Sequence, residues 1–406
     1  MTRRNDSIID IDGSRGEGGG QVVRVAFSLA AITSQAVRVN NIRANRPKGG
    51  GLKSQHATSI EYLASTTQAD VEGLQVGSKT VVFRPTRAPC ALIDRIITIA
   101  APSEAASTSL IFQAVLPFLL HASGPSDADA PITLTITGGT NVSFSPSFEY
   151  LSQVLLPTLR ARYGILVESS LESRAWATGP ATKGCVRYTI HPLKPGQRLQ
   201  PHQTRQELAS LAASPTISRV DVSIIVPSQL QAAFQDRLAS DLAAVLPTAD
   251  VNFVLLEDSG HDARVYVLLV AHSADGAFRW GRDSLASYPK KPKAQPTFVR
   301  SLSTALVKDL HREVTAPGGS MGDEYMQDQL VVFQTLADGE STFFRHDEKS
   351  PAYLEDERMR LDRGDEPFGQ GSLHAQTARW VASEMLPAAK FFNKGTVCAG
   401  VGFPIP

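Results

Sequence analysis

The chain has 406 residues, 42% of them hydrophobic and 20% charged, which is enough apolar sequence for a sizeable core in two or three domains. Its 40 Lys and Arg residues balance 40 Asp and Glu residues, which excludes a protein that binds nucleic acid through an overall basic field, so any RNA contact must come from a local cluster. Cys90, Cys185 and Cys398 lie far apart, which excludes a disulfide framework and favours a reducing compartment.

The N-terminal segment carries no sign of export or membrane insertion. The first seven residues, MTRRNDS, are polar and are followed at once by a predicted strand. No stretch is apolar over the length that a membrane-spanning helix needs. We therefore expect an intracellular protein of the nucleus or cytoplasm with no membrane partner.

The first predicted strand, residues 8–11, leads through a glycine-rich loop into a helix over residues 22–32. Glycines allow backbone N–H groups to approach a ligand, and the helix start adds the positive end of its dipole, so the element suits a phosphate or another anion. Its residue order matches neither a Walker loop nor a dinucleotide fingerprint. Glu17 is out of place there unless it holds a metal or positions a hydroxyl. The alternative is a tight turn with an exposed glutamate.

A second strand, residues 36–44, is followed by another glycine-rich loop and a helix over residues 55–65. Arginine forks and lysine charges in such a loop suit phosphodiester contacts, although a solvated basic loop is the alternative. Gln55 and His56 either cap the helix or face the same site. The basic residues are Arg43, Arg46, Lys48 and Lys53.

The order of strand, loop and helix recurs along the chain, and each copy follows another apolar helix. Repeated strand–helix units predict an α/β fold built from three similar βαβα-type modules. The recurring segments are the strand 131–136, the loop 137–147, the helices 148–159 and 371–386, and the preceding helices 22–32, 107–120 and 326–337.

Residues 195–291 differ in texture from the rest of the chain. Three β-branched runs, at 220–226, 251–257 and 264–270, surround one amphipathic segment at 229–246. This pattern predicts a smaller inserted α/β domain with its own core, joined to the next module by a Pro- and Lys-rich linker. The catalytic domain would then comprise residues 1–194 and 292–406.

The stretch 345–371 is highly charged and poor in aliphatic residues, so we expect a flexible surface loop. It immediately precedes His374, a residue that opens the last predicted helix. A neutral imidazole is a competent nucleophile near pH 7 because its ordinary pKa is about 6.5.

Two carboxylates, Glu324 and Asp328, are spaced four residues apart with Tyr325 between them. On a helix they would share a face. A tyrosine that stacks on a base beside acids that bind hydroxyls or Mg²⁺ suits a nucleotide. The alternative is an ordinary helix start, where acids interact favourably with the dipole.

Taken together, the segments DGSRGEGGGQVVR, NIRANRP, LKSQHAT, STSLIFQAVLPFLL, ITGGTN, DEYMQDQL and LHAQT resemble the RNA 3′-terminal phosphate cyclase family. The resemblance extends over nearly the whole chain, with the segments in the same order. It implies three modules similar to the C-terminal domain of a bacterial translation initiation factor, with one smaller inserted α/β domain.

The resemblance also implies an ATP-dependent enzyme of the ligase class that acts in RNA processing. Such enzymes join AMP to a histidine, transfer it to an RNA 3′-phosphate and form a 2′,3′-cyclic phosphate. His374 matches the adenylylated histidine, and Mg²⁺ or Mn²⁺ is expected at Glu17 or Asp328. The ATP-binding positions match Gln113, Glu324, Tyr325, Met326, Gln327 and Asp328, and the polar residues that line the centre and contact the RNA phosphate match Glu17, Arg24, Arg43, Arg46 and Gln55.

Three departures from the family pattern are visible: an extra residue in the loop PKGGGLK, the sequence VSFSPS after GGTN, and the long charged stretch before His374. The main alternative function is a non-catalytic ribosome-assembly factor of the same fold that binds RNA. Such relatives lack the nucleophilic histidine, which is present here. A transferase acting on phosphorylated small molecules would explain the basic loop but not His374.

Overall fold

The computed structural model describes residues 8–46, 49–123, 130–180, 182–212, 215–316, 319–345 and 359–404. Across these ranges it is a mixed α/β structure with three four-stranded sheets and one three-stranded sheet. None of the helices in these ranges is long and apolar enough to cross a membrane. The α/β class predicted from the sequence is therefore confirmed.

The first two modules share one topology. In each, two parallel strands are connected by a helix, and an antiparallel hairpin completes the sheet in the order first–second–fourth–third. The first module comprises β1 (Ile9–Asp12), α1 (Gly20–Thr33), β2 (Val37–Asn40), α2 (Ser54–Thr67), β3 (Asp70–Glu72) and β4 (Val81–Arg84). The second comprises β5 (Ile96–Ala100), α3 (Thr108–Leu120), β6 (Ile132–Gly138), α4 (Phe148–Tyr150), a π-helical turn (Leu151–Leu155), α5 (Leu156–Tyr163), β7 (Val167–Ser173) and β8 (Gly184–Ile190), with a 3₁₀ turn (Pro89–Ala91) before it.

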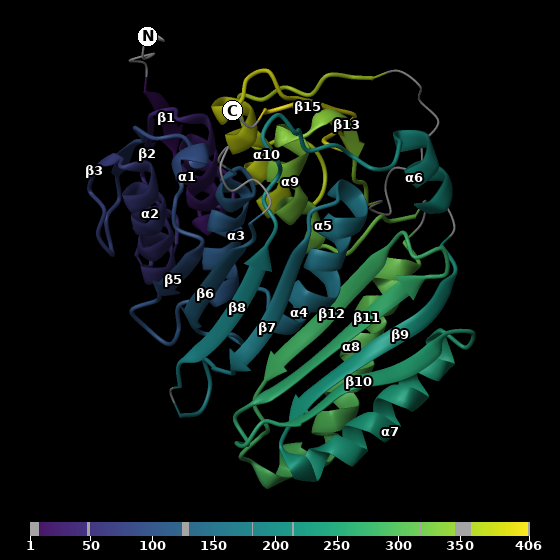
Figure 1. Ribbon diagram of the computed structural model, residues 1–406. Helices are drawn as coiled ribbons and strands as arrows, with labels where there is room; N and C mark the ends of the chain where they lie inside the picture. Colours follow the sequence, from purple (N-terminus) through teal and green to yellow (C-terminus); the bar gives the residue numbers. More distant parts are fainter. Residues whose placement is uncertain are drawn as a thin grey trace.

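The third module has a smaller sheet. Its strand β13 pairs with β15, which pairs with β14, all antiparallel. Before α9, in the place along the chain that β1 has before α1, Met321 N donates to Phe344 O at 3.0 Å. Helix α10 packs on α1 and α9, so the third module closes against the first (Figure 1). Its elements are α9 (Met326–Leu336), β13 (Asp338–Thr342), α10 (Leu373–Met385), β14 (Lys390–Phe392) and β15 (Val397–Val401).

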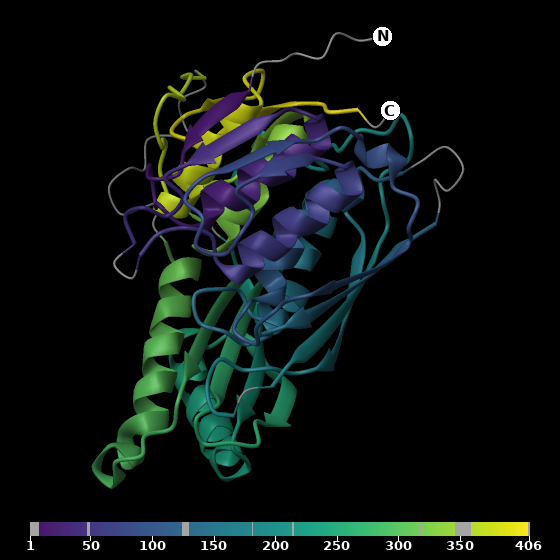
Figure 2. The same ribbon diagram turned by 90° about the vertical axis from the view of Figure 1, so that its left-hand side faces the viewer.

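The inserted domain projects below the modules, with α7 and α8 against one face of its sheet, whose order is β10-β9-β11-β12 (Figures 1 and 2). All nine residues of β11 are buried, which explains its continuous apolar run, whereas exposed residues alternate along the edge strand β10. The elements are β9 (Ile217–Val226), α7 (Ser228–Val245), β10 (Asp250–Asp258), β11 (Val265–Ser273), β12 (Arg279–Ala286), a 3₁₀ turn (Pro292–Ala294) and α8 (Gln295–Val314).

The contacts of α8 and α6 favour other boundaries for this domain than the expected 195 and 291. Helix α8 packs on α7, β11 and β12 through Leu306, Val307 and Leu310, so it belongs to the inserted domain. At the other boundary, Asp338 N donates to Leu199 O at 2.7 Å, and α6 (Arg205–Ala212) packs on β13. Residues 195–212 therefore belong with the third module, and the Pro- and Lys-rich linker connects two elements of the inserted domain.

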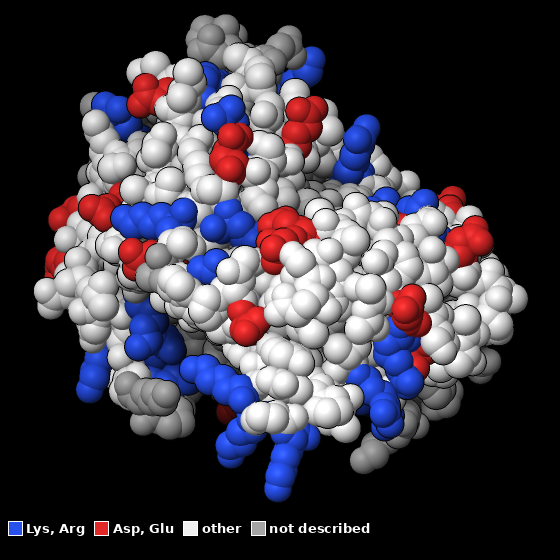
Figure 3. Space-filling view, turned by 90° about the horizontal axis from the view of Figure 1, so that it is seen from below, with Lys and Arg blue, Asp and Glu red and all other residues white. Residues whose placement is uncertain are grey.

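The surface seen from below mixes acidic and basic side chains around a broad uncharged area (Figure 3). The basic side chains lie in several separate groups, in the middle of this view as well as toward its edges. This distribution agrees with the zero formal net charge. Any contact with a polyanion must therefore depend on a local cluster, as the composition predicts.

Candidate active site

Glu17 lies in the loop between β1 and α1, and it is folded inward rather than exposed. Its side chain is only 4% exposed, and its Oε1 accepts a hydrogen bond from Gln21 N at 3.0 Å, which caps the start of α1. Gly16 has a φ of +67°, and a Cβ at Gly16 would collide with Thr377 of α10. A Cβ at Gly19 would collide with the Glu17 carboxylate. The glycines thus let the carboxylate and α10 approach the same loop.

His374 approaches Glu17 from the other end of the chain. It is the second residue of α10, whose start is capped by Ser372 Oγ accepting from Ala375 N at 3.2 Å. The His374 Nδ1 atom lies 3.9 Å from Glu17 Oε2, and the imidazole side chain is 52% exposed. A second contact, from Glu17 N to Thr377 Oγ1 at 3.0 Å, fixes the loop against the helix. The fold therefore places an accessible imidazole beside a buried carboxylate.

Asp328 and Arg24 form the inner wall of this site. Asp328 is 7% exposed, and burial raises the pKa of its carboxyl to about 6 even though His374 and Arg24 act in the opposite direction. Burial lowers the pKa of Arg24, while Asp328 and Glu17 favour its charged form. Arg24 also donates to Oε1 of the Gln21 side chain. The two acids and Arg24 therefore share one partly dehydrated environment.

The basic loop after β2 supplies further positive charge. Arg46 forms an ion pair with Glu17, and burial together with Arg46 lowers the pKa of Arg43. Burial, Arg24, Arg43 and Lys53 lower the pKa of His56 to about 3, so its imidazole is neutral. His56 Nδ1 accepts from Lys53 N at 3.3 Å, so His56 caps α2; its Nε2 also faces the site loop, where a Cβ at Gly20 would collide with it. The cations exceed the nearby carboxylates, which favours an anion.

Two further candidate residues, Gln55 and Lys48, follow Arg46 in the sequence. Gln55 is half-buried at the second position of α2, directly before His56. Lys48 lies outside the described residues. The prediction that Gln55 contacts a substrate stays open.

Gln113 lies in α3 and lines a pocket enclosed by α1, α3, α5 and α9. Both polar atoms of its amide are buried without a hydrogen-bond partner among the described residues. Buried polar groups are normally satisfied, so the amide is a candidate for a ligand contact. Arg24 and Asp328 line the same pocket, which links it to the site around Glu17.

The segment Glu324–Asp328 does not present its acids on one helical face. Helix α9 begins at Met326, so Glu324 precedes it and accepts from Arg282 of the inserted domain at 3.1 Å. Asp328 instead points toward Arg24 and His374. The expectation that both acids share a face is therefore wrong, because the turn at residues 323–325 reorients the chain.

The other residues of this segment have different exposures. The Tyr325 residue is 44% exposed, which leaves its ring accessible to a planar partner. Met326 is fully buried and packs in the core. Gln327 is 4% exposed, and its side-chain carbonyl has no partner among the described residues. A Cβ at Gly371 would collide with that carbonyl, so Gln327 lies against the turn that leads to His374.

Residues 359–371, the described part of the stretch 345–371, lie against this site. Arg15 donates to Asp365 O at 3.0 Å, and Arg379 of α10 donates to Phe368 O at 2.9 Å. Asp362 accepts from Lys394 N at 2.9 Å. Residues 346–358, on which most of the loop prediction falls, lie outside the described residues.

The expected metal positions are not organised as a protein cage. Within the described ranges, no three His, Cys, Asp or Glu side chains gather to hold a metal ion. Glu17 is paired with Arg46, and Asp328 faces Arg24. These carboxylates therefore do not fit a metal site made by the protein alone.

Sequence reasoning missed two contributors to the site. Thr377 follows His374 in LHAQT, where a helix-face argument from the nucleophile would have indicated it. Arg282 comes from the inserted domain, and no local pattern marks it. Its contact with Glu324 exists only because β12 docks against the turn before α9.

Comparison with known proteins identifies a family over most of the chain. A family model described as RNA 3′-terminal phosphate cyclase matches residues 15–390, a range that includes every expected site residue. A protein of Methylococcus capsulatus named RNA 3′-terminal phosphate cyclase is 34% identical over 349 residues, 83% of this chain and 86% of the relative. Proteins with the same name from Archaeoglobus fulgidus (43% over 187 residues, 46% of this chain and 52% of the relative) and Drosophila melanogaster (29% over 348 residues, 83% and 86%) also match.

Proposed function

The chain belongs to the RNA 3′-terminal phosphate cyclase family of enzymes, and we propose that it uses ATP to convert an RNA 3′-phosphate to a 2′,3′-cyclic phosphate through a His374–AMP intermediate. The observation that carries this proposal is the half-exposed imidazole of His374 beside the buried carboxylate of Glu17. A non-catalytic RNA-binding relative would not need a nucleophile held in this way.

Glu17 prepares His374 for nucleophilic attack. A carboxylate beside Nδ1 favours the tautomer with the proton on Nδ1, which leaves the Nε2 lone pair free. Nε2 then forms a bond to the α-phosphorus of ATP, and the bond to pyrophosphate breaks. Positive charge on the phosphorylated imidazole is stabilised by Glu17, whose Oε2 is 3.9 Å from Nδ1.

The next steps follow from the leaving groups. An oxygen of the RNA 3′-phosphate attacks the AMP phosphorus, and the bond to Nε2 breaks. The neighbouring 2′-hydroxyl then attacks the activated 3′-phosphate, and AMP leaves. Adenylylation thus exchanges a poor leaving group for a better one, dividing one difficult reaction into easier steps.

The surrounding cations stabilise the phosphates during these transfers. Arg24, Arg43 and Arg46 gather around Glu17 with few compensating acids. Charge-assisted bonds from arginine to phosphate are strong and geometrically specific. We assign Arg43 and Arg46 chiefly to the RNA phosphate, because both lie in the loop that follows β2.

The nucleotide is assigned to the side of the site formed by α3 and α9. The free amide of Gln113 and the accessible ring of Tyr325 are suited to a base and its ribose, with Gln327 and Asp328 between them. When bound, Mg²⁺ or Mn²⁺ would screen phosphate charge.

Labelling the protein with ATP radioactive at the α-phosphate tests the assignment. Wild-type protein should acquire one covalent AMP, located by mass spectrometry at His374, and His374→Ala should acquire none while keeping its circular dichroism spectrum. The exposed His261 in the inserted domain provides the matched control, because His261→Ala should label like wild type. Normal labelling of His374→Ala would refute the assignment, and RNA binding without labelling of wild type would favour the assembly-factor alternative.

A further inference from the structure

The edge strand of the inserted domain docks against the turn that carries Tyr325. Gly281 N, at the outer edge of β12, donates to Asp323 Oδ2 at 2.7 Å. The next residue, Arg282, donates to Glu324 Oε2 at 3.1 Å. Two consecutive residues of β12 therefore contact two consecutive residues of the turn.

Asp323, which accepts the hydrogen bond from β12, also fixes the backbone conformation of the turn before α9. Its side chain is fully buried, and Oδ1 accepts from Tyr150 Oη at 2.7 Å, Tyr325 N at 2.9 Å and Met326 N at 3.1 Å. A carboxylate with this number of donors holds the backbone of the turn in one geometry. The direction in which Tyr325 leaves the backbone is thus set partly by the inserted domain.

A second carboxylate, that of Glu313, also binds the Arg282 guanidinium. Glu313, in the last turn of α8, is 2% exposed and forms ion pairs with both Arg282 and Arg345. Arg345 donates to its two carboxylate oxygens at 3.0 and 2.8 Å. The guanidinium of Arg282 is therefore anchored within the inserted domain, so that its position does not depend on Glu324 alone.

The same guanidinium covers part of the Tyr325 ring. Its Cζ lies 4.9 Å from the ring centroid, within the range of a cation–π interaction. The ring of Tyr150 meets Tyr325 at 82°, with the centroids 6.3 Å apart. Tyr325 is nevertheless 44% exposed. The ring is thus supported by Arg282 and Tyr150 and still presents open surface.

We propose that Arg282 is a positioning residue for ATP, holding the Tyr325 ring in the orientation in which the adenine base stacks on it. This inference rests on the proposed function. It assigns to the inserted domain a part in nucleotide affinity, in addition to its packing role. The AMP transfer itself takes place at His374, which Arg282 does not contact in the described structure.

The test measures how the rate of self-adenylylation depends on ATP concentration in Arg282→Lys. Lysine keeps a cation against Glu313, so the buried carboxylate retains a partner, but it lacks the planar fork that bonds Glu324 and covers the ring. We expect the half-saturating ATP concentration to rise about tenfold. The maximal rate should change less than twofold, because ground-state placement of the base is affected and the transfer chemistry is not.

A double-mutant cycle separates this role from a purely structural one. Tyr325→Leu should also raise the half-saturating concentration, and adding Arg282→Lys to it should have little further effect, because the ring through which Arg282 acts is gone. Independent, multiplying effects would overturn the proposal, as would an unchanged half-saturating concentration in Arg282→Lys.

Two further variants complete the design. Arg279→Lys is the matched control: Arg279 lies on the same strand but donates to Gln153 O at 3.1 Å, away from the turn, so its variant should behave like wild type. If Arg282→Lys does not fold, Tyr325→Leu decides: it should raise the half-saturating ATP concentration, and an unchanged concentration would refute the proposal. Absence of labelling in wild-type protein would instead refute the proposed function.

Discussion

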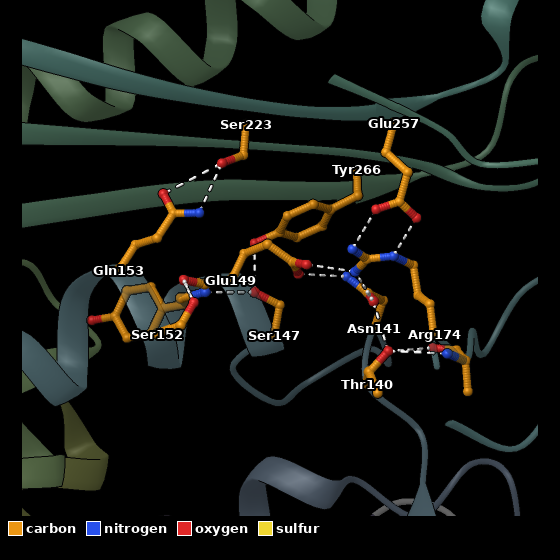
Figure 4. Close-up of polar contacts among 12 residues, drawn as sticks. Thr140, Asn141, Ser147, Glu149, Ser152, Gln153, Arg174, Ser223, Glu257 and Tyr266 are labelled. Atoms are coloured by element: carbon orange, nitrogen blue, oxygen red, sulfur yellow. Dashed lines mark hydrogen bonds and ion pairs between the residues drawn. The ribbon is translucent and has the colours of Figure 1, made fainter. Parts of the chain in front are cut away.

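The first and second modules have the same topology, but the connection between the second strand and the following helix has different contacts in the two modules. In the first, the connection from β2 to α2 carries Arg43 and Arg46, and Arg46 forms an ion pair with Glu17. In the second, the equivalent connection from β6 to α4 is bound to the inserted domain, where Ser147 Oγ and Tyr266 Oη are 2.5 Å apart (Figure 4).

The charged side chains next to these two connections explain why one is exposed to a ligand and the other is bound to the inserted domain. Arg174 of the second module is 10% exposed and is shared by Glu149 and, through two 2.8 Å hydrogen bonds, by Glu257 of the inserted domain (Figure 4). Its charge is satisfied within the protein. Around Glu17, by contrast, arginines outnumber acids: burial and Arg46 lower the pKa of Arg43, and burial, Arg24 and Arg43 lower the pKa of His56. The same backbone topology thus forms a contact between domains in the second module, where the charges are paired. In the first module, where they are not, it forms a site suited to an anion.

The largest contrast is expected between the two buried glutamates. Glu17→Gln should lower the adenylylation rate at saturating ATP by about a hundredfold, because the imidazole loses the carboxylate that sets its tautomer. Glu149→Gln should leave that rate near wild type but reduce the free energy of unfolding by about 3 kcal/mol, because Arg174 loses one partner of a buried pair. Labelling kinetics and urea denaturation measure the two quantities. Equal loss of labelling in both variants would contradict the distinction.

A smaller effect is expected from the arginines of the basic loop. Arg43→Ala and Arg46→Ala should weaken RNA use by about tenfold and self-adenylylation by less. Each lost phosphate contact should reduce the slope of log affinity against log salt by about 0.7 for single-stranded RNA. Arg38→Ala is the control, since Arg38 pairs with Asp10 on β1 and is 37% exposed. Loss of labelling with normal RNA binding would assign the loop to the nucleotide.

The neutral His56 predicts a pH dependence of stability. Its pKa is about 3 in the folded protein, below an unfolded value of about 6.5, so the unfolded state binds the proton first as pH falls. Stability should therefore decrease by about 1.4 kcal/mol per pH unit below 6.5, in addition to other groups. His56→Gln should lack this component. The difference in unfolding free energy between the two proteins from pH 7 to 5 measures it, and parallel curves would show that His56 is protonated in the fold.

The smallest effect is expected from residues 346–358. Replacing them by a short Gly-Ser link should change the adenylylation rate less than twofold, because loop-closure free energy varies by only about 0.6 kcal/mol per doubling of length. Extending the deletion to residue 371 should reduce activity, since Arg379 and Arg15 contact that part. A large loss from the shorter deletion would indicate a lid over ATP.

A lid remains the competing interpretation of that stretch, with Arg345, Lys349 and Arg358 as its candidate phosphate contacts. Arg345 is committed to Glu313 in this structure. Lys349 and Arg358 lie outside the described residues. Only the deletion kinetics address these two side chains.

Local sequence patterns were sufficient to predict the periodic elements of the three modules and the loop and helix contexts of Glu17 and His374. Apolar spacing and glycine clusters report which segment forms a helix or a tight loop, because these properties depend on neighbouring residues. The order of strands and helices in the first two modules follows from them. The α/β class and the existence of an inserted domain could be predicted on this basis.

The contacts between segments that are distant in the sequence became known only from the three-dimensional structure. Helix α8 belongs to the inserted domain because Leu306 and Leu310 pack on its sheet, although their spacing would suit any apolar partner. Glu324 and Asp328 separate because Arg282 holds one and the buried site around Arg24 holds the other. The approach of His374 to Glu17 likewise depends on α10 packing against α1. Burial and charge pairing are properties of contacts between distant segments, and no local pattern specifies the partner.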